Sequence, residues 1–113
     1  MSESGIRYPE EYLEFIELFN REKFFEAHEV LESLWKREKG EARDYYHGLI
    51  QIAAASVHLQ RGTPEGGREL LKKAARYLER YRPAFMGLDL EKLLRETEAC
   101  LIGRAPFPQL SLA

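Results

Sequence analysis

The chain contains little cysteine, few amide side chains and no long hydrophobic run. Its one cysteine, Cys100, cannot form an internal disulfide, and the simplest interpretation is a cytoplasmic protein. No apolar run approaches the roughly 20 residues of a membrane-spanning helix, so no membrane association is expected. Residues 1–5 also lack the basic and then apolar pattern of a secretory signal. These absences favour an intracellular, soluble protein.

Charge is plentiful but unevenly distributed. Residues 1–60 hold twelve acidic and seven basic side chains, whereas residues 61–113 hold seven acidic and ten basic ones. Such a balance does not favour non-specific nucleic-acid binding, so no nucleic-acid partner is expected. Abundant charge with scarce amides favours a thermophilic source. Arg68, Lys72, Arg76 and Arg80 recur every four residues, which indicates a solvated helix face or a site for phosphate, RNA or an acidic partner.

Hydrophobic periodicity predicts an all-α fold with five helices and no sheet. The helices are expected at about residues 9–20, 22–39, 41–60, 64–81 and 89–103, with Asp89 as an N-cap. Their short connections favour antiparallel hairpins, which pack as a compact five-helix bundle. We expect a single domain over residues 1–113, with a helical core at about 9–103. In the extended tail, residues 104–113, Phe107 and Leu110 are expected to dock on the bundle.

The helix predicted at 22–39 has polar side chains on its apolar face. At 100° per residue, His28 lies between Phe24 and Leu31 on one side and Glu32 on the other, and Trp35 lies within 20° of it. These positions should face the interior of the bundle. His28 and Glu32 are therefore not ordinary surface charges.

The helix predicted at 41–60 has a matching polar stripe of His47, Gln51 and His58. If Gly40 forms a tight turn, the two helices run antiparallel. Two residues then face each other when their residue numbers sum to about 79. That register predicts Glu32 opposite His47, His28 opposite Gln51, and Trp35 opposite Asp44. His58 lies ~16 Å from His47 along the helix axis and could line the same groove.

Three interpretations of these stripes stay open. A buried hydrogen-bonded network would satisfy the polar groups mutually. A divalent metal, zinc or iron, could be held by His28, Glu32 and His47, since two histidines and a carboxylate leave an open coordination position. A Glu–His pair could also perform general acid–base chemistry. The expected pocket residues are Trp35, Asp44, Gln51 and His58, surrounded by the aromatic side chains Phe24, Phe25, Trp35, Tyr45 and Tyr46.

Residues 24–35 resemble the bacterial and archaeal family named domain of unknown function 309. Its hallmark, H-x-x-x-E-x-x-W/Y, is matched by His28, Glu32 and Trp35, and further similar stretches are 48–55, His58 and 87–90. The resemblance covers roughly residues 12–90. It implies an all-α fold and a suspected metal-binding role for His28 and Glu32, and it implies no activity.

The sequence thus predicts a protein of unknown function with a polar pocket between its second and third helices, with metal binding as the sharper hypothesis. The alternative is a non-enzymatic interaction module that uses its helical hairpins as a groove. A small molecule or a protein could be the partner, and a homo-oligomer is left open. Whether the chain is an enzyme is not decided by these patterns.

Overall fold

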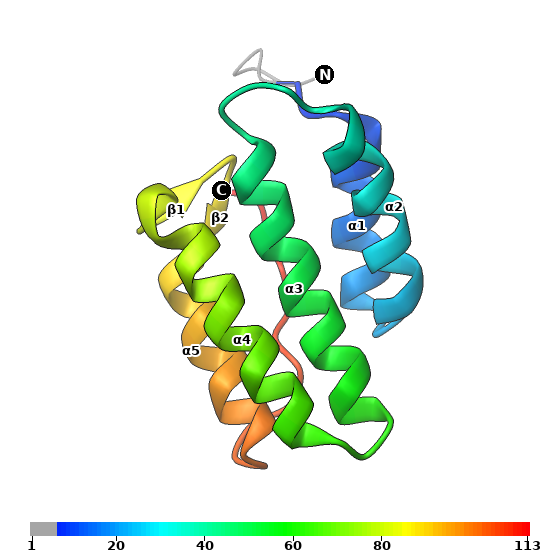
Figure 1. Cartoon of the computed structure of the whole chain (residues 1–113), viewed down its shortest axis with the longest axis vertical. Helices are drawn as coiled ribbons and strands as arrows, with labels where there is room; N and C mark the ends of the chain where they lie inside the picture. Colours follow the sequence, from blue (N-terminus) through cyan, green and yellow to red (C-terminus); the bar gives the residue numbers. More distant parts are fainter. Residues whose placement is uncertain (1–6) are drawn as a thin grey trace.

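The computed structural model describes residues 7–113 and contains five α-helices (Figure 1). They are α1 (Glu10–Asn20), α2 (Phe24–Arg37), α3 (Arg43–Gln60), α4 (Pro64–Leu78) and α5 (Leu90–Leu101). Between α4 and α5 lie a 3₁₀ turn, η1 (Glu79–Tyr81), and two short strands, β1 (Ala84–Phe85) and β2 (Leu88–Asp89). The all-α prediction is confirmed, whereas the expectation of no sheet is corrected by this hairpin. Residues 1–5, where a signal pattern was sought, lie outside the described residues.

Helix α3 occupies the centre of the bundle, with α1 and α2 on one side and α4 and α5 on the other (Figure 1). Sequential helices pack against each other as the short connections predict. Two glycines allow α3 and α4 to approach closely. A Cβ atom on Gly48 would lie 2.6 Å from Cγ of Leu78, and one on Gly67 would lie 2.7 Å from the carbonyl oxygen of Ala55. This close packing fixes the relative position of α3 and α4.

The helix ends follow local chemistry in several places. Helix α1 begins directly after Pro9 and buries its predicted apolar face, which consists of Tyr12, Phe15, Ile16 and Phe19. The carboxylate of Asp89 accepts a hydrogen bond from the backbone N–H of Lys92 at 3.0 Å, so Asp89 caps α5 as predicted. Glycine at position 103 adopts a φ of 77° just beyond α5, which is the left-handed conformation that ends many helices.

The β1–β2 hairpin is held on the bundle by buried tyrosines. Its two turn residues, Met86 and Gly87, both have positive φ, as a type I′ turn requires. The Tyr12 hydroxyl donates to the carbonyl of Met86 at 2.9 Å, and the Tyr45 hydroxyl donates to that of Phe85 at 3.1 Å. Burial raises the pKa of both tyrosines far above the usual value, so both hydroxyls remain protonated donors.

The C-terminal tail passes behind α3 and packs on α1 and α2 (Figure 1). The ring of Phe107 lies 4.6 Å from that of Phe24, and the side chain of Asn20 exchanges two hydrogen bonds with the backbone of Leu110, at 2.7 and 2.9 Å. The predicted docking of Phe107 and Leu110 is confirmed. Within residues 7–113, none of the helices combines the length and apolar character needed to cross a bilayer.

Candidate functional site

The contact between α2 and α3 has a different register from the one that the sequence predicts. The ring of Trp35 lies 4.6 Å from the ring of His47, so the facing residue numbers sum to 82 rather than to about 79. Trp35 therefore lies opposite His47 instead of Asp44. The same register moves His28 away from Gln51 and toward Ala54, Val57 and His58, with which it lines a groove.

The reason for the shift lies in the connection between the two helices. Helix α2 ends at Arg37 and α3 begins at Arg43, so the turn is a five-residue loop instead of a tight turn at Gly40. Arg43 holds this loop, because its guanidinium donates to the carbonyls of Trp35 at 2.8 Å and of Glu38 at 3.0 Å. The same guanidinium lies 4.6 Å from the centre of the Trp35 ring. The loop and the arginine together set the register.

One end of the interface, which we call the packed end, consists of Trp35, His47, Gln51 and Tyr77. The His47 ring lies between the rings of Trp35, at 4.6 Å, and Tyr77, at 4.2 Å. Nε2 of Gln51 lies 3.2 Å from Nε2 of His47. Since an amide nitrogen can only donate, the neutral imidazole accepts this bond and holds its own proton on Nδ1. Within the packed end, His47 is therefore held by one hydrogen bond and by two ring contacts.

Burial lowers the pKa of His47 below its usual value, and the neighbouring Arg43 acts in the same direction. The carboxylates of Asp44 and Glu32 oppose this effect without cancelling it. His47 is therefore neutral at pH 7. Beside it, Lys73 and Arg76 join His47, Gln51 and Tyr77 in lining an open depression of about 550 Å³ on the α4 side.

The other end of the interface, which we call the histidine groove, is open. It has a volume of about 300 Å³ and is lined by Phe25, His28, Ala54, Val57, His58, Arg61 and Thr63. The imidazole of His28 stacks on Phe25, with ring centres 6.1 Å apart. Its Nδ1 atom is buried and has no hydrogen-bond partner among the described residues. A buried polar atom without a partner is costly and rare in native structures.

His58 is held in place by the turn between α3 and α4. Its Nδ1 lies 2.9 Å from the hydroxyl oxygen of Thr63, and that hydroxyl donates to the carbonyl of His58 at 3.1 Å. Because the hydroxyl proton is used in the second bond, the first one requires a proton on Nδ1 of His58. Nε2 of a neutral His58 then carries a free lone pair. Gly66 leaves room for the ring, since a Cβ there would lie 2.6 Å from Nδ1.

Arg61 and Phe25 form the exposed wall of the histidine groove. The guanidinium carbon of Arg61 lies 5.9 Å from the centre of the Phe25 ring, and Phe25 is 48% exposed. Among residues 7–113, no carboxylate oxygen lies within 4.0 Å of the Arg61 guanidinium. The groove therefore combines two imidazoles, a hydroxyl, an aromatic face and an uncompensated positive charge.

The predicted metal ligands His28, Glu32 and His47 are not gathered into one centre. Among residues 7–113, no three His, Cys, Asp or Glu side chains lie close enough together to hold a metal ion. His28 lines the histidine groove, His47 belongs to the packed end, and Glu32 lies partly exposed on α2 between them. Asp44 is exposed in the first turn of α3. Of the expected pocket residues, His58 shares a groove with His28, while Trp35 and Gln51 contact His47.

Most of the aromatic residues expected around the site lie elsewhere. Phe25 and Trp35 do contact His28 and His47, respectively. Phe24 packs instead on Phe19 and Phe107, and Tyr45 and Tyr46 pack on Tyr12. Phe24 thus packs toward α1 and the tail, Tyr46 packs toward α1, and Tyr45 packs toward α1 and the β1–β2 hairpin.

Sequence reasoning missed Arg61, Thr63 and Gly66 as parts of the groove. Thr63 occupies the N-cap position of α4, but its side chain makes no cap bond and instead binds the end of α3. A usable signal was present, because Thr63 follows His58 by five residues across a glycine turn. A residue in that position can reach the last turn of the preceding helix.

Comparison with known proteins gives a family match and relatives in several bacteria. The sequence model of the family described as "Domain of unknown function (DUF309)" matches residues 12–70. The chain is 34% identical over 91 residues to the uncharacterized protein YpuF of Bacillus subtilis (strain 168), a match that covers 77% of this chain and 52% of YpuF. It is 31% identical over 93 residues to an uncharacterized protein of Aquifex aeolicus (strain VF5), covering 78% of this chain and 28% of that protein. The chain thus spans about half or less of these curated relatives.

A solved structure is similar over most of the chain. It is the crystal structure of a conserved hypothetical protein from Thermus thermophilus, with a TM-score of 0.72 and 35% sequence identity. The match covers 86% of this chain and 100% of that one. The family match at residues 12–70 contains both histidines of the histidine groove, together with Arg61, Thr63 and Gly66.

Proposed function

The chain belongs to the DUF309 family, and we propose that this member binds a small anionic molecule in the histidine groove. The ligand class is a molecule with a phosphate or carboxylate group that also carries a hydroxyl. The groove volume of about 300 Å³ is at the lower end of the range for small-molecule sites. A ligand of about ten non-hydrogen atoms would bind with a Kd on the order of 0.1–1 mM.

The buried Nδ1 of His28 is the observation that carries the proposal. A neutral imidazole has one proton, and a buried Nδ1 without a partner costs about 1–3 kcal/mol whether it holds that proton or the lone pair. We propose that the proton lies on Nε2, the ring nitrogen left to meet a ligand, because a ligand oxygen can accept a hydrogen bond from it there. His28 accordingly acts as an N–H donor, and the partner of such a donor is an acceptor oxygen. Arg61 adds a positive charge at the same groove, which favours an anionic oxygen.

His58 supplies the complementary group. The bond from its Nδ1–H to Thr63 leaves the Nε2 lone pair of the neutral ring to accept a hydroxyl proton from the ligand. A phosphate monoanion or a hydroxy acid can occupy both positions, accepting from His28 and Arg61 while donating to His58. The exposed ring of Phe25 offers an apolar face for the rest of the molecule.

The same observation argues against His28 as a metal ligand in this arrangement. Metal-bound histidines almost always donate the other ring N–H to a carbonyl, a carboxylate or water. A metal on Nε2 of His28 would instead leave a proton on the sealed Nδ1 with no acceptor. His58 does have such a partner in Thr63, but it shares the groove with the cationic Arg61. The residues as arranged therefore fit an anion better than a metal ion.

A titration followed by NMR of ¹³C,¹⁵N-labelled protein tests the proposal. Mandelate and phenyl phosphate serve as anionic probes at about pH 6, where roughly half of the phosphate ester is the monoanion that carries a P–OH group. 1-Phenylethanol serves as the neutral control, and Zn²⁺ alone as the metal probe. We expect the anions, but not the alcohol, to shift the imidazole signals of His28 and His58. His28→Leu and Arg61→Gln should each weaken binding by about tenfold or more.

Matched controls are available on the same helices. His47→Gln removes the third histidine, which lies outside the groove, and Arg37→Gln removes an exposed arginine at the far end of α2, so both should leave anion affinity unchanged. Signals of His28 and His58 that do not respond to either anion would refute the proposal. Saturable Zn²⁺ binding that His28→Leu abolishes would support the metal hypothesis instead.

A further inference from the structure

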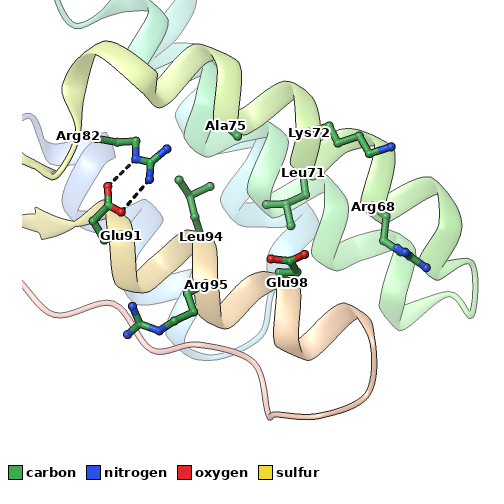
Figure 2. Close-up of a pocket in the computed structure, with 9 residues that line it drawn as sticks. All are labelled: Arg68, Leu71, Lys72, Ala75, Arg82, Glu91, Leu94, Arg95 and Glu98. Atoms are coloured by element: carbon green, nitrogen blue, oxygen red, sulfur yellow. Dashed lines mark hydrogen bonds and ion pairs between the residues drawn. The ribbon is translucent and has the colours of Figure 1, made fainter.

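A second groove lies between α4 and α5, away from the histidine groove (Figure 2). It has a volume of about 480 Å³, and its floor is apolar, consisting of Leu71, Ala75 and Leu94. Figure 2 shows Leu71 and Leu94 pointing into the space between the two helices. We call this cavity the α4–α5 groove. An apolar floor that no other residue of the described range 7–113 covers is suited to receive a side chain from outside.

Charged side chains surround this floor, and their balance is positive. The lining includes four basic residues, Arg68, Lys72, Arg82 and Arg95, and two acidic ones, Glu91 and Glu98. Arg82 and Glu91 engage each other, since Arg82 donates to Glu91 at 2.7 Å, and Lys72 pairs with Glu69 at 3.4 Å. Arg68 and Arg95 have no acidic partner among the ion pairs of residues 7–113. The groove therefore presents an apolar centre with an excess of positive charge.

Helix α1 has the complementary surface on its outer face. Leu13 is 44% exposed. Glu10 and Glu17 flank it at spacings of three and four residues, and the exposed Glu14 follows it directly in the sequence. We call these four residues the acidic α1 stripe. Glu17 pairs with Arg21 at 3.2 Å, whereas Glu10 and Glu14 have no basic partner within 4.0 Å among the described residues. An exposed leucine among acidic residues matches an apolar floor among basic ones.

The two surfaces cannot meet within one molecule. Helix α1 lies on one side of α3, and the α4–α5 pair lies on the other side (Figure 1). We propose that the acidic α1 stripe of one copy docks in the α4–α5 groove of a second copy, with Leu13 on the floor formed by Leu71, Ala75 and Leu94. The uneven charge, twelve acidic to seven basic in residues 1–60 and seven to ten in residues 61–113, supports this pairing of unlike ends.

A head-to-tail contact has a testable consequence. Each pairing leaves one free stripe and one free groove, so association continues into a ring or an open chain instead of stopping at a symmetric dimer. Because the partners attract each other through exposed charges, added salt should weaken the contact. Leu13 provides the apolar anchor, so its truncation should weaken the contact at any salt concentration.

Two variants that each lose one surface allow a decisive mixing experiment by sedimentation-velocity ultracentrifugation. The stripe variant carries Leu13→Ser and Glu14→Ser, and the groove variant carries Arg68→Ser and Arg95→Ser; all four positions are exposed. In low salt, we expect wild-type protein to show concentration-dependent association, and each variant alone to associate about tenfold or more weakly. An equimolar mixture should form one-to-one dimers and nothing larger, because only one intact stripe and one intact groove can pair.

The controls Glu29→Ser and Arg104→Ser alter exposed charges outside both surfaces and should associate as the wild type does. Circular dichroism would verify that every variant is folded. The proposal is overturned if wild-type protein stays monomeric in low salt at all concentrations. It is equally overturned if the two variants associate as strongly as wild type, or if their mixture gains no dimer.

Discussion

The two ends of the α2–α3 interface both place histidine beside aromatic rings, and they differ in how the imidazole nitrogens are used. At the packed end, His47 lies between Trp35 and Tyr77 and accepts a hydrogen bond from Gln51. At the histidine groove, His28 buries one nitrogen without a partner, and His58 is held by Thr63 with its other nitrogen free. The first end engages its imidazole through a hydrogen bond and two ring contacts, and the second leaves ring nitrogens for a ligand. The role of a polar residue on an apolar helix face, structural or ligand-binding, therefore depends on the residues that it contacts.

Replacing Trp35 with alanine should give the largest effect on stability. The change removes the ring that packs on His47 and lies under Arg43, and it should lower the free energy of unfolding by about 3 kcal/mol. The melting temperature should fall by roughly 10 °C. Phe25→Ala at the groove is the matched control, since Phe25 is half exposed and should cost less than about 1 kcal/mol. Equal losses of unfolding free energy in the two variants would show that the packed end contributes no more to stability than the histidine groove does.

Leucine substitutions of the two histidines should have different consequences. His47→Leu removes the hydrogen bond to Gln51 and leaves the Gln51 amide without a partner. The free energy of unfolding, measured in urea, should fall by about 1–2 kcal/mol. His28→Leu removes a buried nitrogen that had no partner, so stability should stay within about 1 kcal/mol of wild type or rise. A larger loss from His28→Leu than from His47→Leu would contradict this contrast.

Gly66→Ala should change the groove more than it changes overall stability. Alanine favours the helix by up to about 1 kcal/mol, but its Cβ would press on His58, which must then move. We expect a net change in the free energy of unfolding below about 1 kcal/mol, together with weaker binding of phenyl phosphate. In a His58→Ala background the clash is absent, and Gly66→Ala should become stabilising. A double-mutant cycle measures this coupling, and additive effects would mean that the two residues are independent.

The pH dependence contributed by His47 should be the smallest effect. Its pKa is lower in the folded chain than in the unfolded chain, where imidazole titrates near about 6.5. Between the two pKa values the unfolded state binds more protons, so stability is complete above about pH 6.5 and falls as the pH is lowered toward the folded pKa. His47→Phe keeps a ring between Trp35 and Tyr77 and should flatten this decline. Melting curves from about pH 7.5 to 5 measure the slope, and parallel curves for the two proteins would exclude His47 as its source.

The helices could be predicted because their signals are local. Apolar residues recur at helical spacing, Pro9, Pro64 and Asp89 lie at helix starts, and Gly103 follows the last helix. The β1–β2 hairpin could not be predicted in the same way. Its turn uses Met86 and Gly87 at positive φ, a pair that lacks the usual Asn-Gly signal, and it is stabilised by tyrosines that lie 40 or more residues away in the chain.

The sequence by itself determined that polar side chains lie on the facing sides of α2 and α3, because periodicity places His28, Glu32, His47 and Gln51 on apolar helix faces. Only the tertiary structure decided which of these residues meet. The α2–α3 loop and the bonds of Arg43 shift the register by about three residues, almost one helical turn. That shift pairs His47 with Trp35 and moves His28 to His58, because helix spacing fixes which face a residue occupies but not its height along the partner helix.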